Sequence, residues 1–187
     1  MKIPINTFSF SGKLVREEPV SGGKLLHIEQ LVGGKMPTLL PVAVKTEFIP
    51  SHLKPGSEVF IGNARLSRSP KRELFVAGKA VYSVQLKADI NEADISGIVT
   101  EITECGSSYI LTLWHDDEQA AGIQVMVGSK AFEAHHITSG DEVLILGGLI
   151  YQKEKNFWIR VTDSSQIMLI ERGNPDKGII QARDKFI

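Results

Sequence analysis

The chain has 187 residues and almost balanced charge, with 21 Lys and Arg against 22 Asp and Glu. Its single cysteine, Cys105, excludes an internal disulfide, and no apolar run approaches the roughly 20 residues that a membrane-spanning helix needs. The first residues lack the apolar core of a secretory signal peptide. We therefore expect a cytoplasmic protein with no membrane partner, and a length that fits one large or two small domains.

The near-zero total charge hides a strong division between the two halves. Residues 1–88 hold 13 Lys and Arg against 6 Glu, a net charge of +7, whereas residues 89–170 hold 4 against 13 acids, a net charge of −9. A basic first half predicts a polyanionic partner for that half. The acidic second half leaves three interpretations open: a basic protein partner, self-association with the basic face of another copy, or solubility alone.

The two halves also repeat the same motifs in the same order. Ser11-Gly12 returns as Ser96-Gly97, the apolar run 25–28 returns at 110–113, and the run 55–61 returns with one residue of drift at 139–145. This pattern predicts a tandem duplication, with a basic domain at 1–88 and an acidic domain at 89–170. Residues 171–187 are then a C-terminal tail or a strand exchanged between subunits.

Short runs rich in β-branched and aromatic residues predict about five strands in each half. Glycine and proline punctuate these runs, as turns require. The clearest runs lie at 24–28, 41–44 and 58–61, and then at 109–114, 123–127, 142–146 and 157–161.

The connection between the third and fourth strands differs between the halves. In the second half, residues 129–137 predict a short helix with Ser129 as its N-cap. The matching stretch 48–55 carries Pro50 and Pro55, so it can hold at most a turn.

Five strands with a connector between the third and the fourth is the order of the OB-fold, a small Greek-key barrel. The Ser-Gly motif near the start, the Gly-x-Glu-Val motif at 56–59 and 140–143, and a polar hairpin before the fifth strand resemble the bacterial single-stranded DNA-binding protein family, here in tandem. The resemblance covers about 8–83 and 93–170. It implies an all-β fold of two OB barrels, with a short helix in the second. The same turns are also compatible with another small barrel.

The resemblance further implies binding of single-stranded DNA, or of RNA, without strong sequence preference and without a cofactor. Replication, repair, recombination and plasmid or phage maintenance are the processes that such a protein serves. Two features depart from the family. The sequence ends at 181–187 without the family's acidic, proline- and phenylalanine-containing tip, and a fused pair of domains favours a monomer or dimer over the family's tetramer. We therefore carry over neither recruitment by the tip nor the stoichiometry.

Cations of the first half gather where an OB-fold exposes its ligand-facing strands and loops. The strongest cluster is the hairpin 67–72, although a charged surface turn would give the same pattern. Binding by this half is expected to be mostly electrostatic and to weaken steeply with salt. The predicted phosphate contacts are Lys13, Lys24, Lys45, Arg65, Arg68, Lys71 and Arg72.

Alternation along strands predicts which aromatic groups face outward. If Leu26 and Leu111 point into the barrels, then His27 and Trp114 point out, and the same reasoning places Trp158 on the outer face. Such groups either stack on bases or pack in a protein interface. If they stack, the nearby cations are Lys153, Lys155 and Arg160.

No residue pattern predicts a catalytic or metal site. His135 and His136 are neighbours and so point in different directions on a helix, and the acidic run 116–118 lacks the spacing of a calcium loop. We therefore expect a protein that is not an enzyme. An OB-type nuclease would need metal-dependent cleavage, and the alternative function is an OB-fold protein-protein interaction or assembly module with no nucleic-acid ligand.

Overall fold

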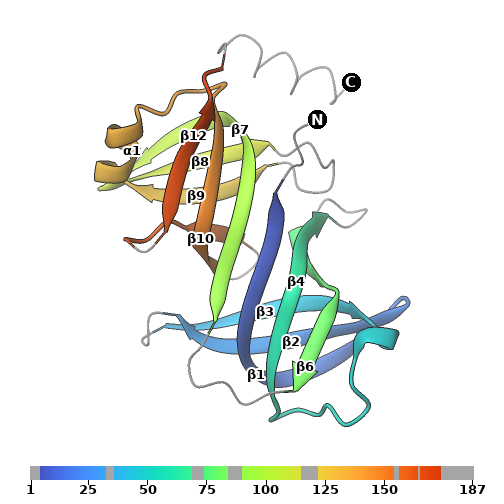
Figure 1. Cartoon of the computed structure of the whole chain (residues 1–187). Coiled ribbons are helices and arrows are strands. Elements are labelled where there is room, and N and C mark those ends of the chain that lie inside the picture. The colour runs from blue at the N-terminus through green and yellow to red at the C-terminus, as the bar shows by residue number, and fades with distance from the viewer. Residues whose placement is uncertain are drawn as a thin grey trace. The chain divides into compact units, whose positions relative to one another are not determined.

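The structure is a computed structural model that describes residues 5–32, 36–68, 74–83, 90–114, 122–153, 156–163 and 165–173. These residues form two compact units, each built around a β-barrel (Figure 1). We call the unit with Thr7–Glu92 and Tyr151–Asn156 the basic unit, and the unit with the other described residues the acidic unit. The linear division at 1–88, 89–170 and 171–187 stays a prediction.

The basic unit contains a closed barrel of five strands. The strands β1, β2, β3, β5 and β4 pair in that order around the barrel, and β4 returns to β1. The β3–β5 pair is parallel, which is the arrangement that closes an OB barrel. The elements are β1 (Asn6–Val20), β2 (Gly23–Val32), β3 (Met36–Lys45), the 3₁₀ turn η1 (Thr46–Phe48), β4 (Glu58–Arg68), β5 (Leu74–Gly78) and β6 (Ala80–Ser83).

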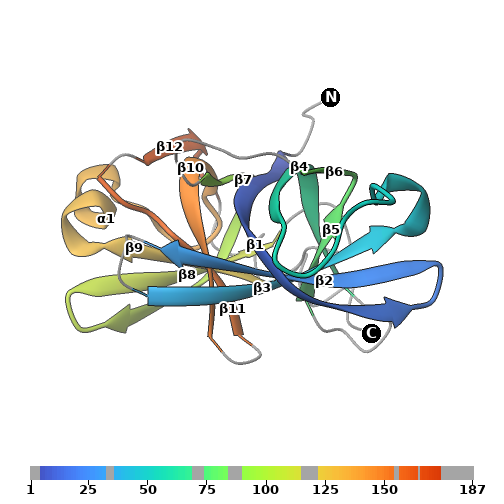
Figure 2. The same ribbon diagram turned by 90° about the horizontal axis from the view of Figure 1, so that it is seen from below.

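The acidic unit repeats this topology (Figure 2). Its strands β7, β8, β9, β11 and β10 pair in the same order, with a parallel β9–β11 pair, and β10 returns to β7. The elements are β7 (Asn91–Cys105), β8 (Ser108–Trp114), β9 (Ile123–Gly128), α1 (Ser129–His135), β10 (Glu142–Lys153), β11 (Asn156–Arg160) and β12 (Gln166–Glu171). The predicted all-β fold of two tandem OB barrels, with a short helix in the second, is confirmed.

Two details differ from the sequence predictions. Each barrel carries a sixth strand, β6 on β4 and β12 on β10, where five strands were expected. The helix begins at Ser129 as predicted, but its N-cap is Gly128 and no side chain caps it. The prediction of Ser129 as N-cap was therefore wrong, because the strand β9 runs directly into the helix and leaves no extended residue after Gly128.

Close packing of two strands explains the repeated Ser-Gly motif. A Cβ added to Gly97 would lie 2.7 Å from the backbone oxygen of Trp114, and one added to Gly12 would collide with the backbone oxygen of Glu29. Both glycines lie on the first strand of a barrel, where it crosses over the second. The motif therefore marks a position at which any side chain would force the two strands apart.

The start of the fourth strand is also identical in the two units. Gly56 and Gly140 have φ angles of +95° and +93°, and their N–H groups donate to the carbonyl oxygens of Leu14 and Val99, each over 2.7 Å. Such φ values favour glycine. The Pro/Ser-Gly motif read from the sequence is therefore the turn that delivers the fourth strand to the first.

The residue that precedes the first strand of each copy forms hydrogen bonds with the first strand of the other copy. In the basic unit, Ile90 N donates to Ser11 Oγ over 2.8 Å and Ser11 N donates to the Ile90 oxygen over 2.7 Å. In the acidic unit, Ile5 N donates to Ser96 Oγ over 3.0 Å and Ser96 N donates to the Ile5 oxygen over 2.9 Å. Residues 5 and 90 are 85 apart, as are 11 and 96, so these contacts belong to the duplication.

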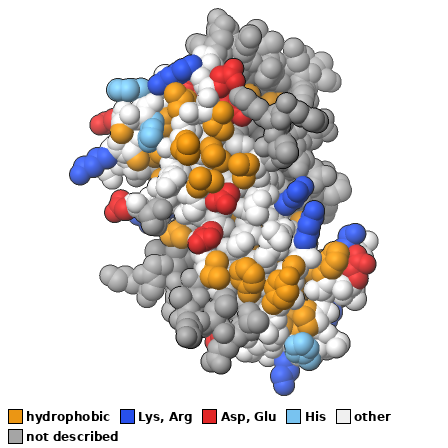
Figure 3. All heavy atoms as spheres, in the orientation of Figure 1, with side chains coloured by type: hydrophobic (Ala, Val, Ile, Leu, Met, Phe, Trp, Pro, Cys, Tyr) orange, Lys and Arg blue, Asp and Glu red, His pale blue; other side chains and the backbone are white. Residues whose placement is uncertain are grey.

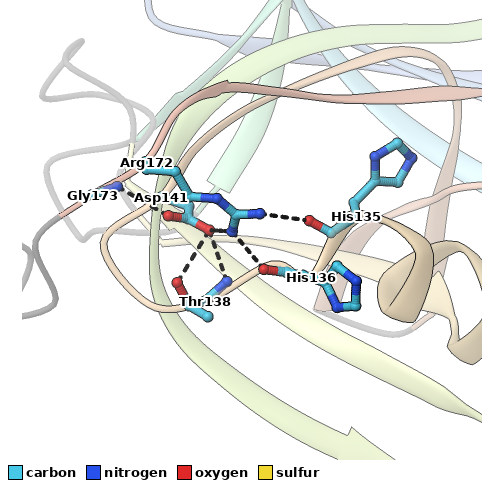
Figure 4. A network of polar contacts seen from close by, with 6 residues as sticks. All are labelled: His135, His136, Thr138, Asp141, Arg172 and Gly173. Atoms are coloured by element: carbon cyan, nitrogen blue, oxygen red, sulfur yellow. Dashed lines mark hydrogen bonds and ion pairs between the residues drawn. The ribbon is translucent and has the colours of Figure 1, made fainter.

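A buried carboxylate ties the end of β12 to the helix (Figure 4). Asp141 is fully buried and accepts hydrogen bonds from Gly173 N on Oδ1 and from Thr138 N and Oγ1 on Oδ2. Arg172 Nη1 lies 2.8 Å from Oδ2, and the same guanidinium donates to the backbone oxygens of His135 and His136. Burial opposes the charged form, but the hydrogen bonds from Gly173 and Thr138 and the charge of Arg172 hold the pKa of Asp141 below its usual value.

Replacing Gly97 with alanine should lower the free energy of unfolding of the acidic unit by about 1–3 kcal/mol, because the new methyl group meets backbone that cannot yield. Both tryptophans of the chain lie in this unit, so urea unfolding followed by tryptophan fluorescence reports on it. Gly128→Ala is the control, since a Cβ there meets nothing within 4 Å. Equal losses in the two variants would contradict the close-packing argument.

Asp141→Asn should destabilise the same unit by about 2–4 kcal/mol at neutral pH, because one amide group cannot accept from donors on both sides. The folded pKa lies below the unfolded one, so this stabilisation is complete above about pH 4 and is lost as the pH falls further. The difference between wild type and variant should therefore shrink in acid. The exposed Asp163→Asn is the control, and a pH-independent difference would contradict the assignment.

Candidate nucleic-acid interface

OB barrels bind oligonucleotides on the outer face of their second and third strands and on the adjoining loops. In the acidic unit this face belongs to β8, β9 and the parallel neighbour β11. The strands' inward residues, Leu111, Val125 and Ile159, are fully buried. Their neighbours in sequence therefore point outward.

The outward residues form two rows across the three strands. The first row joins Thr112 to Gln124 and Gln124 to Trp158, and the second joins Ile110 to Met126 and Met126 to Arg160. Gln124 and Arg160 are exposed, and the others are half-buried. The face therefore combines a large aromatic ring, apolar groups, an amide and a cation.

A hydrogen bond orients the indole of Trp158 along this face. Its Nε1 donates to Oε1 of Gln124 over 2.6 Å, in an exposed position. Trp114 ends β8 two residues beyond Thr112 and is half-buried, opposite Ile98 of β7. Both tryptophans thus lie outside the barrel core, as alternation predicted.

Charges near these tryptophans have both signs. Glu101 of β7 is exposed and continues the first row beyond Thr112, whereas Arg160 lies at the end of the second row, on the same strand as Trp158. Of the other predicted cations, Lys153 ends β10 but its side chain is outside the described part, and Lys155 lies outside the described residues. Among described groups, Arg160 is the predicted cation that the structure brings to this face.

The equivalent face of the basic unit is different. In place of Thr112, Gln124 and Arg160 it carries His27, Pro41 and Ala77, and Ala43 stands where Met126 does. The register of the parallel β3–β5 pair places Phe75, whose side chain is outside the described part, at the position equivalent to Trp158.

His27 is buried, which corrects its prediction as a stacking group. Only 6% of the residue is exposed, and its Nε2 lies 3.1 Å from Oε1 of Glu18 on β1. Burial and the nearby charge of Arg16 lower the pKa of His27, and Glu18 partly opposes the shift. In the β1–β2 hairpin the ring lies opposite Arg16 and its Nε2 is in contact with Glu18, and a ring buried in this way cannot stack on a base.

Four of the predicted cations of the basic unit have described side chains, and two of these lie beside acids. Nζ of Lys24 lies 2.8 Å from Oε1 of Glu17, and Nζ of Lys45 lies 3.7 Å from Oε1 of Glu47. Lys13 is exposed, in register with acids on both neighbouring strands, whereas Arg65 is exposed opposite Ala77 on the outer face of β4 and β5. The backbone of Arg68 ends β4 but its side chain is not described, and Lys71 and Arg72 lie outside the described residues.

Gln124 and Met126 were missed from the sequence. Strict alternation in the run 123–127 could have marked Gln124 and Met126 as outward. The contact with Trp158 could not be read in this way, because it depends on the register of the parallel β9–β11 pair.

Within the described ranges, the structure shows no cluster of three or more His, Cys, Asp or Glu side chains that could hold a metal. Over the same residues, no helix is long and apolar enough to span a bilayer.

Comparison with solved structures finds proteins that share this fold over nearly their whole length. The chain superposes on a deletion variant of the single-stranded DNA-binding protein from Thermus aquaticus with a TM-score of 0.71 and 16% identity, covering 94% of this chain and 98% of that one. The wild-type Thermus aquaticus protein gives a TM-score of 0.69 at 16% identity, covering 92% and 96%. This chain shares their fold. No protein-family model and no curated protein sequence matches it.

Proposed function

We propose that the protein binds single-stranded DNA, and RNA as the alternative polymer, without strong sequence preference, and that it acts in the cytoplasm as a binding protein and not as an enzyme. The observation that carries the proposal is the outer face of β8, β9 and β11, where Trp158 lies with Gln124 and Arg160 on the side that OB barrels use for oligonucleotides. The shared fold with the Thermus aquaticus single-stranded DNA-binding protein supports it.

The proposed mechanism combines stacking with phosphate contacts. A base stacked on an aromatic side chain contributes about 1–3 kcal/mol whatever its identity, because every base has a π-face. Trp158 and Trp114 supply this surface and Arg160 supplies nearby positive charge, while Lys153 and Lys155 stay predicted phosphate contacts. The cations of the basic unit, above all those of the hairpin that contains Arg68, Lys71 and Arg72, add a contact with phosphates that depends on salt.

A second function, as a protein-interaction module, is favoured by a different surface. On the outer face of β10 and β12, Leu144 and Met168 are directly opposite each other, and Met168 and Ile170 are 48% and 41% exposed. Figure 3 shows hydrophobic side chains gathered over these strands. This surface lies on other strands than the tryptophan face, so the two functions can be tested separately.

Trp158→Ala should weaken binding of oligo-dT by roughly 5- to 150-fold, the equivalent of one stacked base. Binding is measured by fluorescence anisotropy of a labelled oligonucleotide. Met168→Ala, an exposed apolar change on β12, is the control and should leave affinity within about twofold of wild type. Unchanged affinity in Trp158→Ala would remove this face from the site. Loss of a protein partner in Met168→Ala, with oligonucleotide binding intact, would favour the second function.

Neutralising Arg68, Lys71 and Arg72 together to Gln should weaken binding of every sequence alike. The slope of log K against log salt should flatten by up to about 2, since each phosphate contact of a single strand contributes about 0.7. A triple change of the exposed Lys54, Lys79 and Lys130 to Gln removes the same charge elsewhere. If both triple variants shift the slope equally, the hairpin has no special role.

A further inference from the structure

The hydrogen bond between Trp158 and Gln124 fixes the orientation of the Gln124 amide. Nε1 of the indole and Oε1 of the amide are 2.6 Å apart. An indole N–H can only donate, and an amide NH₂ group can only donate, so the oxygen of Gln124 must be the atom that faces the indole. The NH₂ group of Gln124 is consequently turned away from Trp158.

Gln124 also lies where a base stacked on Trp158 would place its edge. The two residues are directly opposite each other on the parallel pair β9 and β11, so their backbones are about 4.8 Å apart. Gln124 belongs to the middle strand of the face and is exposed. A base that covers the indole therefore extends over the amide.

We propose that Gln124 discriminates between bases by donating from Nε2 to the substituent at C4 of a pyrimidine or C6 of a purine, so that thymine, uracil and guanine are favoured over cytosine and adenine. Thymine and guanine present an acceptor oxygen at O4 or O6, whereas cytosine and adenine present an amino donor at the corresponding position. An amino group of the base that faces the NH₂ group of Gln124 cannot form a hydrogen bond with it, because both groups are donors. This inference rests on the proposed function and names the ligand chemistry of that site.

Trp158 is the positioning partner in this scheme. Without its N–H, the Gln124 amide can turn over and present either its oxygen or its NH₂ group, and it would then suit either class of base. The preference is expected to be modest, about two- to tenfold, because it depends on one solvent-exposed hydrogen bond.

The test compares oligo-dT with oligo-dC of equal length, which keeps ring size constant and avoids the self-stacking of adenine. Wild type should bind oligo-dT about two- to tenfold more tightly. Trp158→Phe keeps an aromatic face but lacks the N–H, so the dT/dC ratio should fall to about one, whatever affinity the smaller ring costs both oligonucleotides alike.

Gln124→Glu supplies a second route to the same result. The carboxylate still accepts from the indole but has no donor, so the ratio should fall to one or reverse. Its added negative charge weakens both oligonucleotides, and the ratio cancels that effect. Gln166→Glu makes the same charge change on the exposed edge of β12 and should keep the wild-type ratio.

Two outcomes would overturn the inference in different ways. If wild type binds neither oligonucleotide, the proposed function fails and the inference fails with it. If wild type binds both equally, or if its preference survives in Trp158→Phe and Gln124→Glu, then Gln124 does not discriminate between bases, and nucleic-acid binding itself stands.

Discussion

A closed barrel of five strands can fill its interior only if alternate residues of every strand are apolar, and this requirement decides what is left outside. In the acidic unit, Leu111, Val125 and Ile159 meet it and are fully buried. Their neighbours in sequence must then lie on the outer face, whatever their chemistry. The row that contains Gln124 and Trp158 is therefore positioned by the core, and its residues can change without loss of the barrel.

The two copies support this separation of scaffold and surface. The hydrogen bonds that deliver the fourth strand to the first, at Leu14 in one unit and Val99 in the other, are the same to within 0.1 Å, as are the φ angles of the adjacent glycines to within a few degrees. The outer faces differ at several positions: Pro41 stands in the place of Gln124, and Ala77 in the place of Arg160. Contacts that close the barrel have been kept after duplication, whereas the exposed rows have diverged.

Much of this could be predicted from the sequence, because the decisive signals are local. Apolar runs and glycine turns gave the strand order, and alternation placed both tryptophans outside the core. What failed depends on pairing between distant residues. His27 alternates correctly, yet it is buried in the β1–β2 hairpin, where a bulge between Leu14 and Arg16 sets Arg16 opposite it and Glu18 contacts its Nε2. The Trp158–Gln124 contact depends likewise on a parallel register that no short motif encodes.

The total negative charge of the acidic half opposes a nucleic-acid ligand, but the distance of each charge from the site decides how strongly it acts. Glu101 lies three strand spacings from Trp158 in the same row, about 14 Å, whereas Arg160 lies two residues along the strand, about 7 Å away. The Debye length at physiological salt is about 8 Å. A phosphate beside a base on Trp158 would therefore interact with Arg160 more strongly than with Glu101.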